Sequence, residues 1–137
     1  TSSKLFQNVR EKQGLCYYCD STFSWVNNAL FIESGVETEN LERTEEAILA
    51  QLTALQRGEV TKEELEYAKL YMRNSLRSVR DTLHRVEGWY LGRAFDQPDL
   101  SPERAADLLM EYTVEDVVEA ANRLEPAVIY KLKGGGE

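Results

Sequence analysis

Histidine and cysteine are scarce in this chain. Its 137 residues include one histidine, His84, and two cysteines. Zinc catalysis of the His-x-x-Glu-His type needs two histidines one helical turn apart and a glutamate base, so this motif is excluded. A four-cysteine zinc site lacks two of its ligands, and a single histidine gives no basis for a Ser-His-Asp triad. We therefore expect no cofactor in this chain.

Long apolar runs and an excess of positive charge are also missing. No run approaches the roughly 20 apolar residues that cross a bilayer, so we expect no membrane contact. Lysine and arginine number 16 against 24 aspartates and glutamates, which gives a net charge of −8. This balance argues against sequence-independent binding of nucleic acid or anionic lipid. Two cysteines do not make a disulfide scaffold, which favours a reducing, cytoplasmic location.

The rest of the composition is that of an ordinary globular protein. Hydrophobic residues make up 42% of the chain and charged residues 29%, and the length suits one hydrophobic core. Only the glycines near the end resemble a linker, so we predict one domain at 1–133 and a flexible tail at 134–137. The chain begins at Thr1 without a methionine, which favours a piece cut from a longer protein.

Start and stop signals divide most of the chain into helices. These helices are expected to begin near residues 3, 40, 61, 82, 101 and 113. Ser2 or Ser3 can cap the first helix, and Gly14 suits the position just past its end. Thr61 and Glu64 have the spacing of a capping box, which marks the start of the third helix.

Two β-rich segments, 15–26 and 29–36, flank a predicted turn at Asn27 and Asn28. They indicate an antiparallel hairpin.

A break near Asp81 divides a long helical stretch, with Asp81 as the expected cap of the second part. A third strand is predicted at 127–132. We therefore predict an α+β fold, in which an antiparallel sheet of the hairpin and the C-terminal strand packs against several helices.

Cys16 and Cys19 form a Cys-x-x-Cys pattern, which is compatible with a redox dithiol or half of a zinc site. Both interpretations fit poorly because the pair falls in a predicted strand, where residues three apart point to opposite faces. Two ordinary thiols are the favoured interpretation, and the role of the pair stays open.

A basic stripe on one predicted helix permits two interpretations. Its members share one helix and a positive charge: Lys69, Arg73, Arg77 and Arg80. Such a stripe can contact an acidic partner or nucleic acid, or it can be a solvated face. The solvated face is favoured because the whole chain is acidic and no aromatic residues interleave the basic ones.

Arg10 and Tyr17 are the remaining candidates for a site. An arginine near a helix end and a tyrosine on the following strand can lie close together. A guanidinium and a phenol could then both donate to one peptide carbonyl. The spacing alone does not make these two residues a site.

The run 3–17, SKLFQNVREKQGLCY, resembles the C-terminal-domain signature of the insulinase/pitrilysin-type (M16) zinc metallopeptidases. Three later segments, at 58–65, 100–103 and 112–117, also resemble that family's domain in their order and residue types. The resemblance therefore covers nearly the whole chain. The family's domain normally begins with a strand and a helix start that this chain lacks, which implies truncation at the N-terminus.

In that family two halves close like a clamshell, and only one of them carries the zinc motif. The other half offers an arginine and a tyrosine seven positions apart, a pattern that falls here on Arg10 and Tyr17. The resemblance implies a non-catalytic, substrate-binding domain in which these two residues orient a peptide carbonyl. The implied partner is a zinc-bearing half or a homologous subunit, in a homo- or heterodimer. A catalytically dead scaffold of the same family is the alternative.

Overall fold

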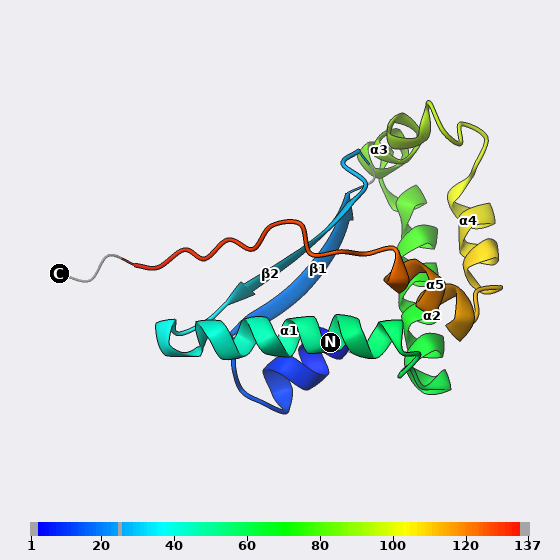
Figure 1. The fold of residues 1–137 in the computed structure, drawn as a ribbon. Coiled ribbons are helices and arrows are strands. Elements are labelled where there is room, and N and C mark those ends of the chain that lie inside the picture. Colours follow the sequence, from blue (N-terminus) through cyan, green and yellow to red (C-terminus); the bar gives the residue numbers. More distant parts are fainter. Residues whose placement is uncertain (1–2, 25, 135–137) are drawn as a thin grey trace.

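The computed structural model describes residues 3–24 and 26–134, and it combines a two-stranded sheet with surrounding helices (Figure 1). In chain order the elements are η1 (Leu5–Glu11), β1 (Tyr18–Ser24), β2 (Ala29–Gly35), η2 (Thr38–Asn40), α1 (Leu41–Gln56), α2 (Lys62–Arg77), η3 (Ser78–Asp81), α3 (Leu83–Arg93), α4 (Pro102–Leu109) and α5 (Val114–Asn122). The predicted α+β class is confirmed.

The hairpin of β1 and β2 is antiparallel. Its register runs from Tyr18 opposite Gly35 to Ser24 opposite Ala29. Asn28 has a φ of 46°, in the left-handed region that asparagine tolerates in turns. The predicted hairpin and its turn are confirmed. Most of its side chains are exposed, so the rest of the described chain covers little of the hairpin surface.

A small apolar core joins the hairpin to the helices. Val9 of η1, Leu15 before β1 and Ala47 of α1 form one buried cluster. Thr44 is also buried, and its hydroxyl donates to the carbonyl oxygen of Leu15 at 3.4 Å. Helix α1 contacts η1 and also reaches α5 (Figure 1). These contacts fix the segment between η1 and β1, which carries the candidate site.

Helices α2, η3, α3 and α4 form a second group of contacting elements. Helix α2 lies against α4 (Figure 1), and the indole of buried Trp89 donates to the carbonyl oxygen of Leu100 at 2.8 Å. Lys4 forms an ion pair with Glu64 at 2.9 Å, which joins the N-terminal segment to α2. Side-chain contacts therefore connect elements that are distant in the sequence.

The helix caps largely follow the sequence signals. The hydroxyl of Thr61 accepts from the amide of Glu64 at 3.1 Å, and the Thr61 amide donates to the Glu64 carboxylate at 2.8 Å. The prediction that Asp81 caps α3 is wrong. Asp81 belongs to η3, so the chain first becomes extended at Thr82, whose hydroxyl accepts from the amide of Arg85 at 3.4 Å.

The predicted third strand at 127–132 is not formed. The structure gives these residues no backbone hydrogen bond to any other described residue, and a strand needs a hydrogen-bonded neighbour. The segment instead runs extended away from the end of α5 (Figure 1). Of the predicted tail at 134–137, residues 135–137 lie outside the described part of the chain, as does Ser2.

Candidate functional site

The first helix, η1, has the wide winding of a π-helix. The amide of Lys12 donates to the carbonyl oxygen of Gln7, five residues back, at 3.0 Å. At the start of the helix the hydroxyl of Ser3 accepts from the amide of Phe6 at 3.2 Å. The helix and its serine cap agree with the sequence, whereas the π winding was not predicted.

Gly14 turns the chain from η1 toward β1. Its φ of +60° lies in the left-handed region, where glycine has no Cβ penalty. The amide of Gly14 donates back to the carbonyl oxygen of Arg10 at 2.9 Å, a bond typical of a glycine-ended helix. The amide of Leu15 donates to the carbonyl oxygen of Val9 at 3.3 Å. This turn fixes the chain path between Arg10 and Tyr17.

Arg10 lies on the last turn of η1. Its guanidinium carbon is 4.8 Å from the ring centroid of Phe6, and its Nη1 atom is 3.3 Å from the carboxylate of Glu11. The Arg10 side chain is 40% exposed, so this ion pair is weak. A guanidinium has five N–H donors, and one neighbouring carboxylate leaves donors for a ligand.

Tyr17 lies one residue before β1. Its amide donates to the carbonyl oxygen of Gly35 at 2.8 Å, which extends the hairpin pairing by one bond. The residue is 63% exposed, and its hydroxyl donates to the Oε1 atom of Glu37. The backbone of Tyr17 is therefore fixed while its phenol lies at the surface.

Arg10 and Tyr17 flank the same core cluster. Val9 precedes Arg10 and Leu15 lies two residues before Tyr17, and both apolar residues are buried. Within residues 3–24 and 26–134 the structure contains no hydrogen bond or ion pair between the two candidate residues. Their joint donation to a peptide carbonyl stays a prediction.

Glu37 is a contact of the candidate site that was not predicted from the sequence. Its carboxylate accepts the phenol proton of Tyr17. A signal for this contact lies in the hairpin register. Because Tyr18 is opposite Gly35, the residue before β1 falls beside the residues that follow β2, and Glu37 is the second of these.

The two cysteines lie in different surroundings, with Cys16 half-buried and Cys19 buried. Cys19 is buried, and burial, with a smaller effect of Cys16, raises the pKa of its thiol to about 11. A thiol with such a pKa stays protonated near neutral pH. The described residues contain no group of three potential metal ligands among histidine, cysteine, aspartate and glutamate. His84 is exposed on α3.

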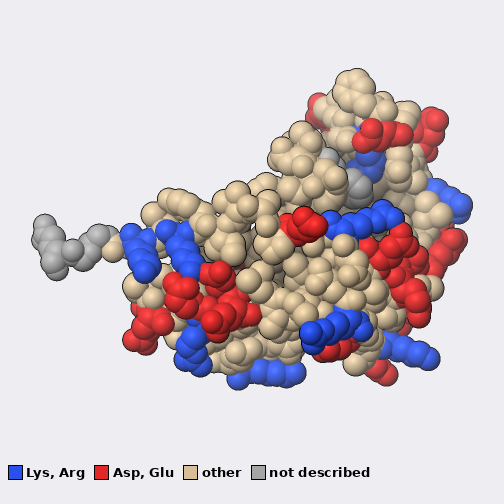
Figure 2. Space-filling model, viewed as in Figure 1, with Lys and Arg blue, Asp and Glu red and all other residues tan. Residues whose placement is uncertain are grey.

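The predicted basic stripe does not lie on one helix, because Arg80 belongs to η3 and the other three residues to α2. The stripe is partly used inside the protein. Lys69 is buried, and its Nζ atom donates to the carbonyl oxygen of Met110 at 3.1 Å. Arg80 forms an ion pair with Glu103. On the face in Figure 2, lysine and arginine side chains are interspersed with acidic and uncharged ones. Since Lys69 is buried and Arg80 is paired with Glu103, the stripe is not a continuous basic surface.

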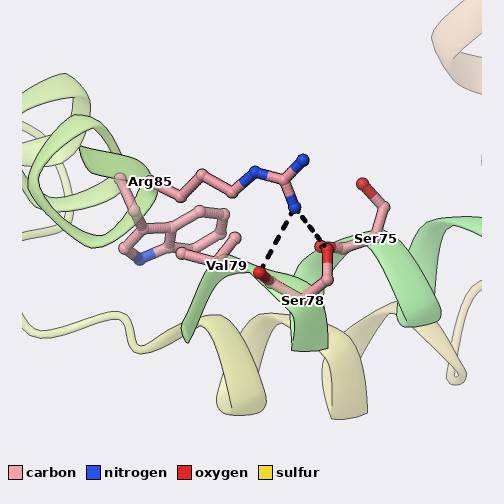
Figure 3. Close-up of a pocket in the computed structure, with 5 residues that line it drawn as sticks. Ser75, Ser78, Val79 and Arg85 are labelled. Atoms are coloured by element: carbon pink, nitrogen blue, oxygen red, sulfur yellow. Dashed lines mark hydrogen bonds between the residues drawn. The ribbon is translucent and has the colours of Figure 1, made fainter. Parts of the chain in front are cut away.

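A surface hollow of ≈ 360 Å³ lies where α2, η3 and α3 meet (Figure 3). Its lining residues are Ser75, Ser78, Val79, Arg85 and Trp89. The Nη1 atom of Arg85 donates to the carbonyl oxygen and hydroxyl of Ser78, at 3.4 and 3.1 Å. No histidine or carboxylate lines the hollow, so its serines have no general base beside them.

Among the residues that the structure describes, no helix has both the length and the apolar character needed to cross a bilayer.

In a comparison with protein families, residues 1–72 match the family model described as "Peptidase M16 inactive domain". The "probable inactive metalloprotease YmfF" of Bacillus subtilis (strain 168) is 30% identical over 132 residues, which cover 96% of this chain and 31% of that protein. An "uncharacterized zinc protease" of Rickettsia bellii (strain RML369-C) is 28% identical over 131 residues, 90% of this chain and 30% of that protein.

A solved structure has a similar fold. It is described as a conserved protein from Enterococcus faecalis V583, with a TM-score of 0.81 and 28% sequence identity. The match covers 90% of this chain and 29% of that one. The chain therefore spans about a third of the length of the curated relatives that it matches.

Proposed function

The chain belongs to the peptidase M16 family, whose inactive domain it matches, and we propose that it binds peptide for a zinc-bearing catalytic half. The chain is a non-catalytic domain of a zinc protease homologue. In the proposal, Arg10 and Tyr17 donate to a carbonyl of the bound peptide. The catalytic half is another part of the same protein or a homologous subunit, in a homo- or heterodimer.

The observation that carries this proposal is the way in which the two donors are held. Arg10 and Tyr17 are partly exposed, while their neighbours Val9 and Leu15 are buried in one cluster. Donors with fixed backbones can stabilise the negative charge that develops on a carbonyl oxygen during peptide hydrolysis. An arginine and a phenol are both suited to this task because each donates a hydrogen bond.

The proposal assigns catalytic zinc to the other half. Among the residues that the structure describes, no three potential ligands form a cluster, and a zinc site needs ligands that converge on one point. The role that we propose for this chain is to bind and orient peptide.

The test is peptide cleavage by the full-length protein together with its zinc-bearing half. We expect Arg10→Ala and Tyr17→Phe each to lower kcat/KM about 100-fold, the range seen when an oxyanion donor is removed. The substrate is the casein-derived peptide that the wild-type protein cleaves fastest. Unchanged turnover in both variants, with the fold retained, would reduce both residues to structural roles.

Matched controls lie next to each candidate. Lys12 is an exposed cation two residues beyond Arg10, and Tyr18 is a half-exposed tyrosine that follows Tyr17. Lys12→Ala and Tyr18→Phe should leave kcat/KM within about twofold of wild type, since neither side chain belongs to the proposed pair.

A scaffold domain in an inactive protein is the second candidate function. The name of the Bacillus subtilis relative, a probable inactive metalloprotease, favours it. Under this alternative the fold and the partner interface are kept while peptide cleavage is lost. Absence of turnover in the wild type, and of a His-x-x-Glu-His motif in the remaining protein and its partners, would support the scaffold.

A further inference from the structure

The side chain of Glu37 accepts a hydrogen bond from the phenol of Tyr17. It lies two residues beyond β2 and immediately precedes η2. Its backbone carbonyl accepts from the amide of Asn40 at 2.9 Å, but its side chain forms no hydrogen bond that caps η2. The exposed carboxylate instead accepts from Tyr17. The side chain of Glu37 is therefore used for the phenol and not for the helix.

The hydrogen bond to Glu37 affects whether the phenol of Tyr17 can donate to a bound peptide. A tyrosine hydroxyl has one proton to donate. When that proton is directed at Glu37, it is not directed at a peptide carbonyl. Hydrogen bonds to a carboxylate are stronger than those to a neutral carbonyl, so a bound peptide has to compete with Glu37 for the donor.

We propose that Glu37 is a positioning residue that restrains Tyr17 and competes with peptide for its hydroxyl proton. This inference rests on the proposed role of Tyr17 in substrate binding. The peptide carbonyl receives this proton only when the bond to the carboxylate breaks, in the bound ground state and in the transition state alike. Glu37 therefore weakens the binding of both states by the same free energy, which raises KM and leaves kcat unchanged.

The inference predicts a separation of KM from kcat. In the full-length protein with its zinc-bearing half, Glu37→Ala should lower KM about fivefold, as expected for removal of one competing exposed hydrogen bond, and should not raise kcat. The isosteric Glu37→Gln, which keeps an acceptor but loses the charge, should lower KM less. The substrate is the same casein-derived peptide.

The matched control is Glu39→Ala. Glu39 is an exposed glutamate in the same segment, so its removal changes the charge of the chain equally without touching Tyr17. Its KM should stay at the wild-type value. In a Tyr17→Phe background, Glu37→Ala should have no further effect, because the proton for which the carboxylate competes is gone.

The outcomes distinguish this inference from the proposed function. If Tyr17→Phe impairs turnover but Glu37→Ala leaves KM unchanged or raises it, the inference is wrong and the proposed function stands. If Tyr17→Phe leaves turnover unchanged, the proposed function itself fails. Should the wild type cleave nothing, the dissociation constant of the fluorescein-labelled casein-derived peptide that the wild type binds most tightly gives the same comparison. Equal affinity of Glu37→Ala and Glu39→Ala would then overturn the inference.

Discussion

Gly35 leaves a space that the ring of Tyr18 occupies. A Cβ atom on Gly35 would lie 2.4 Å from the Cε1 atom of Tyr18 and 2.9 Å from its Cδ1 atom, so the ring would have to move. The carbonyl oxygen of Gly35 also accepts the amide of Tyr17. We expect Gly35→Ala to destabilise the hairpin by about 1–3 kcal/mol, as overpacking does. Amide hydrogen exchange of β1 and β2 in the full-length protein would measure this loss.

Gly88 provides the control for this substitution. It lies within α3, and a Cβ atom there would have no neighbour within 4 Å. Gly88→Ala should stabilise α3 by about 1 kcal/mol, because alanine is the better helix former. Slower exchange in β1 and β2 of Gly35→Ala than of the wild type would contradict the steric argument.

Local signals carried most of the secondary-structure prediction. The capping box of Thr61 and Glu64 acts over three residues, and Gly14 has a φ of 60° beyond the end of η1. Such signals can be read from a short stretch of sequence because the interactions that they describe are themselves local. The hairpin followed from β-rich segments around a turn for the same reason.

The features that the sequence did not reveal depend on longer-range or finer geometry. The hydrogen bond between Tyr17 and Glu37 spans 20 residues and depends on the hairpin register. The cap at Thr82 depends on where η3 ends. Residues 127–132 have the composition of a strand, but strand formation needs a hydrogen-bonded neighbour, which the composition of one segment does not specify.

The extended C-terminal segment is attached to α1 by Lys131. Its Nζ atom lies 2.7 Å from a carboxylate oxygen of Glu42 and 2.5 Å from one of Glu45. The hydrogen bond from Lys131 holds the pKa of Glu42 below its usual value of 4.5. Because folding lowers this pKa, the carboxylate stabilises the folded state above pH 4.5, and this contribution is lost as the pH falls through the lowered value.

We expect Lys131→Met to return the pKa of Glu42 toward 4.5, because both the hydrogen bond and the adjacent charge are removed. Titration of the Glu42 carboxyl carbon by ¹³C NMR would measure the change. Lys133 lowers the same pKa through its charge alone, so Lys133→Met should have a smaller effect. An unchanged Glu42 titration in Lys131→Met would show that the contact does not form in solution.

The molecule as a whole buries little of its apolar surface. The buried hydrophobic residues of the described chain are few and mostly small. Several large apolar side chains are instead strongly exposed, including Phe95 at 99%, Leu83 at 83% and Leu132 at 80%. Exposed apolar side chains in this number are typical of a protein that contacts other protein segments. This agrees with a chain that spans about a third of its relatives' length.

We propose that this chain is part of a longer protein, and the exposed apolar surface then predicts a difference between the two. A dye that fluoresces on apolar surfaces, such as anilinonaphthalene sulfonate, should bind the isolated chain more strongly, because the further domains of the proposed longer protein would cover part of this surface. Phe95→Ser should reduce dye fluorescence in the isolated chain, since that side chain contributes to the surface without belonging to the core cluster. Equal fluorescence per molecule in the isolated chain and the longer protein would mean that the surface stays open in both. The exposed residues would then be available to a separate partner subunit.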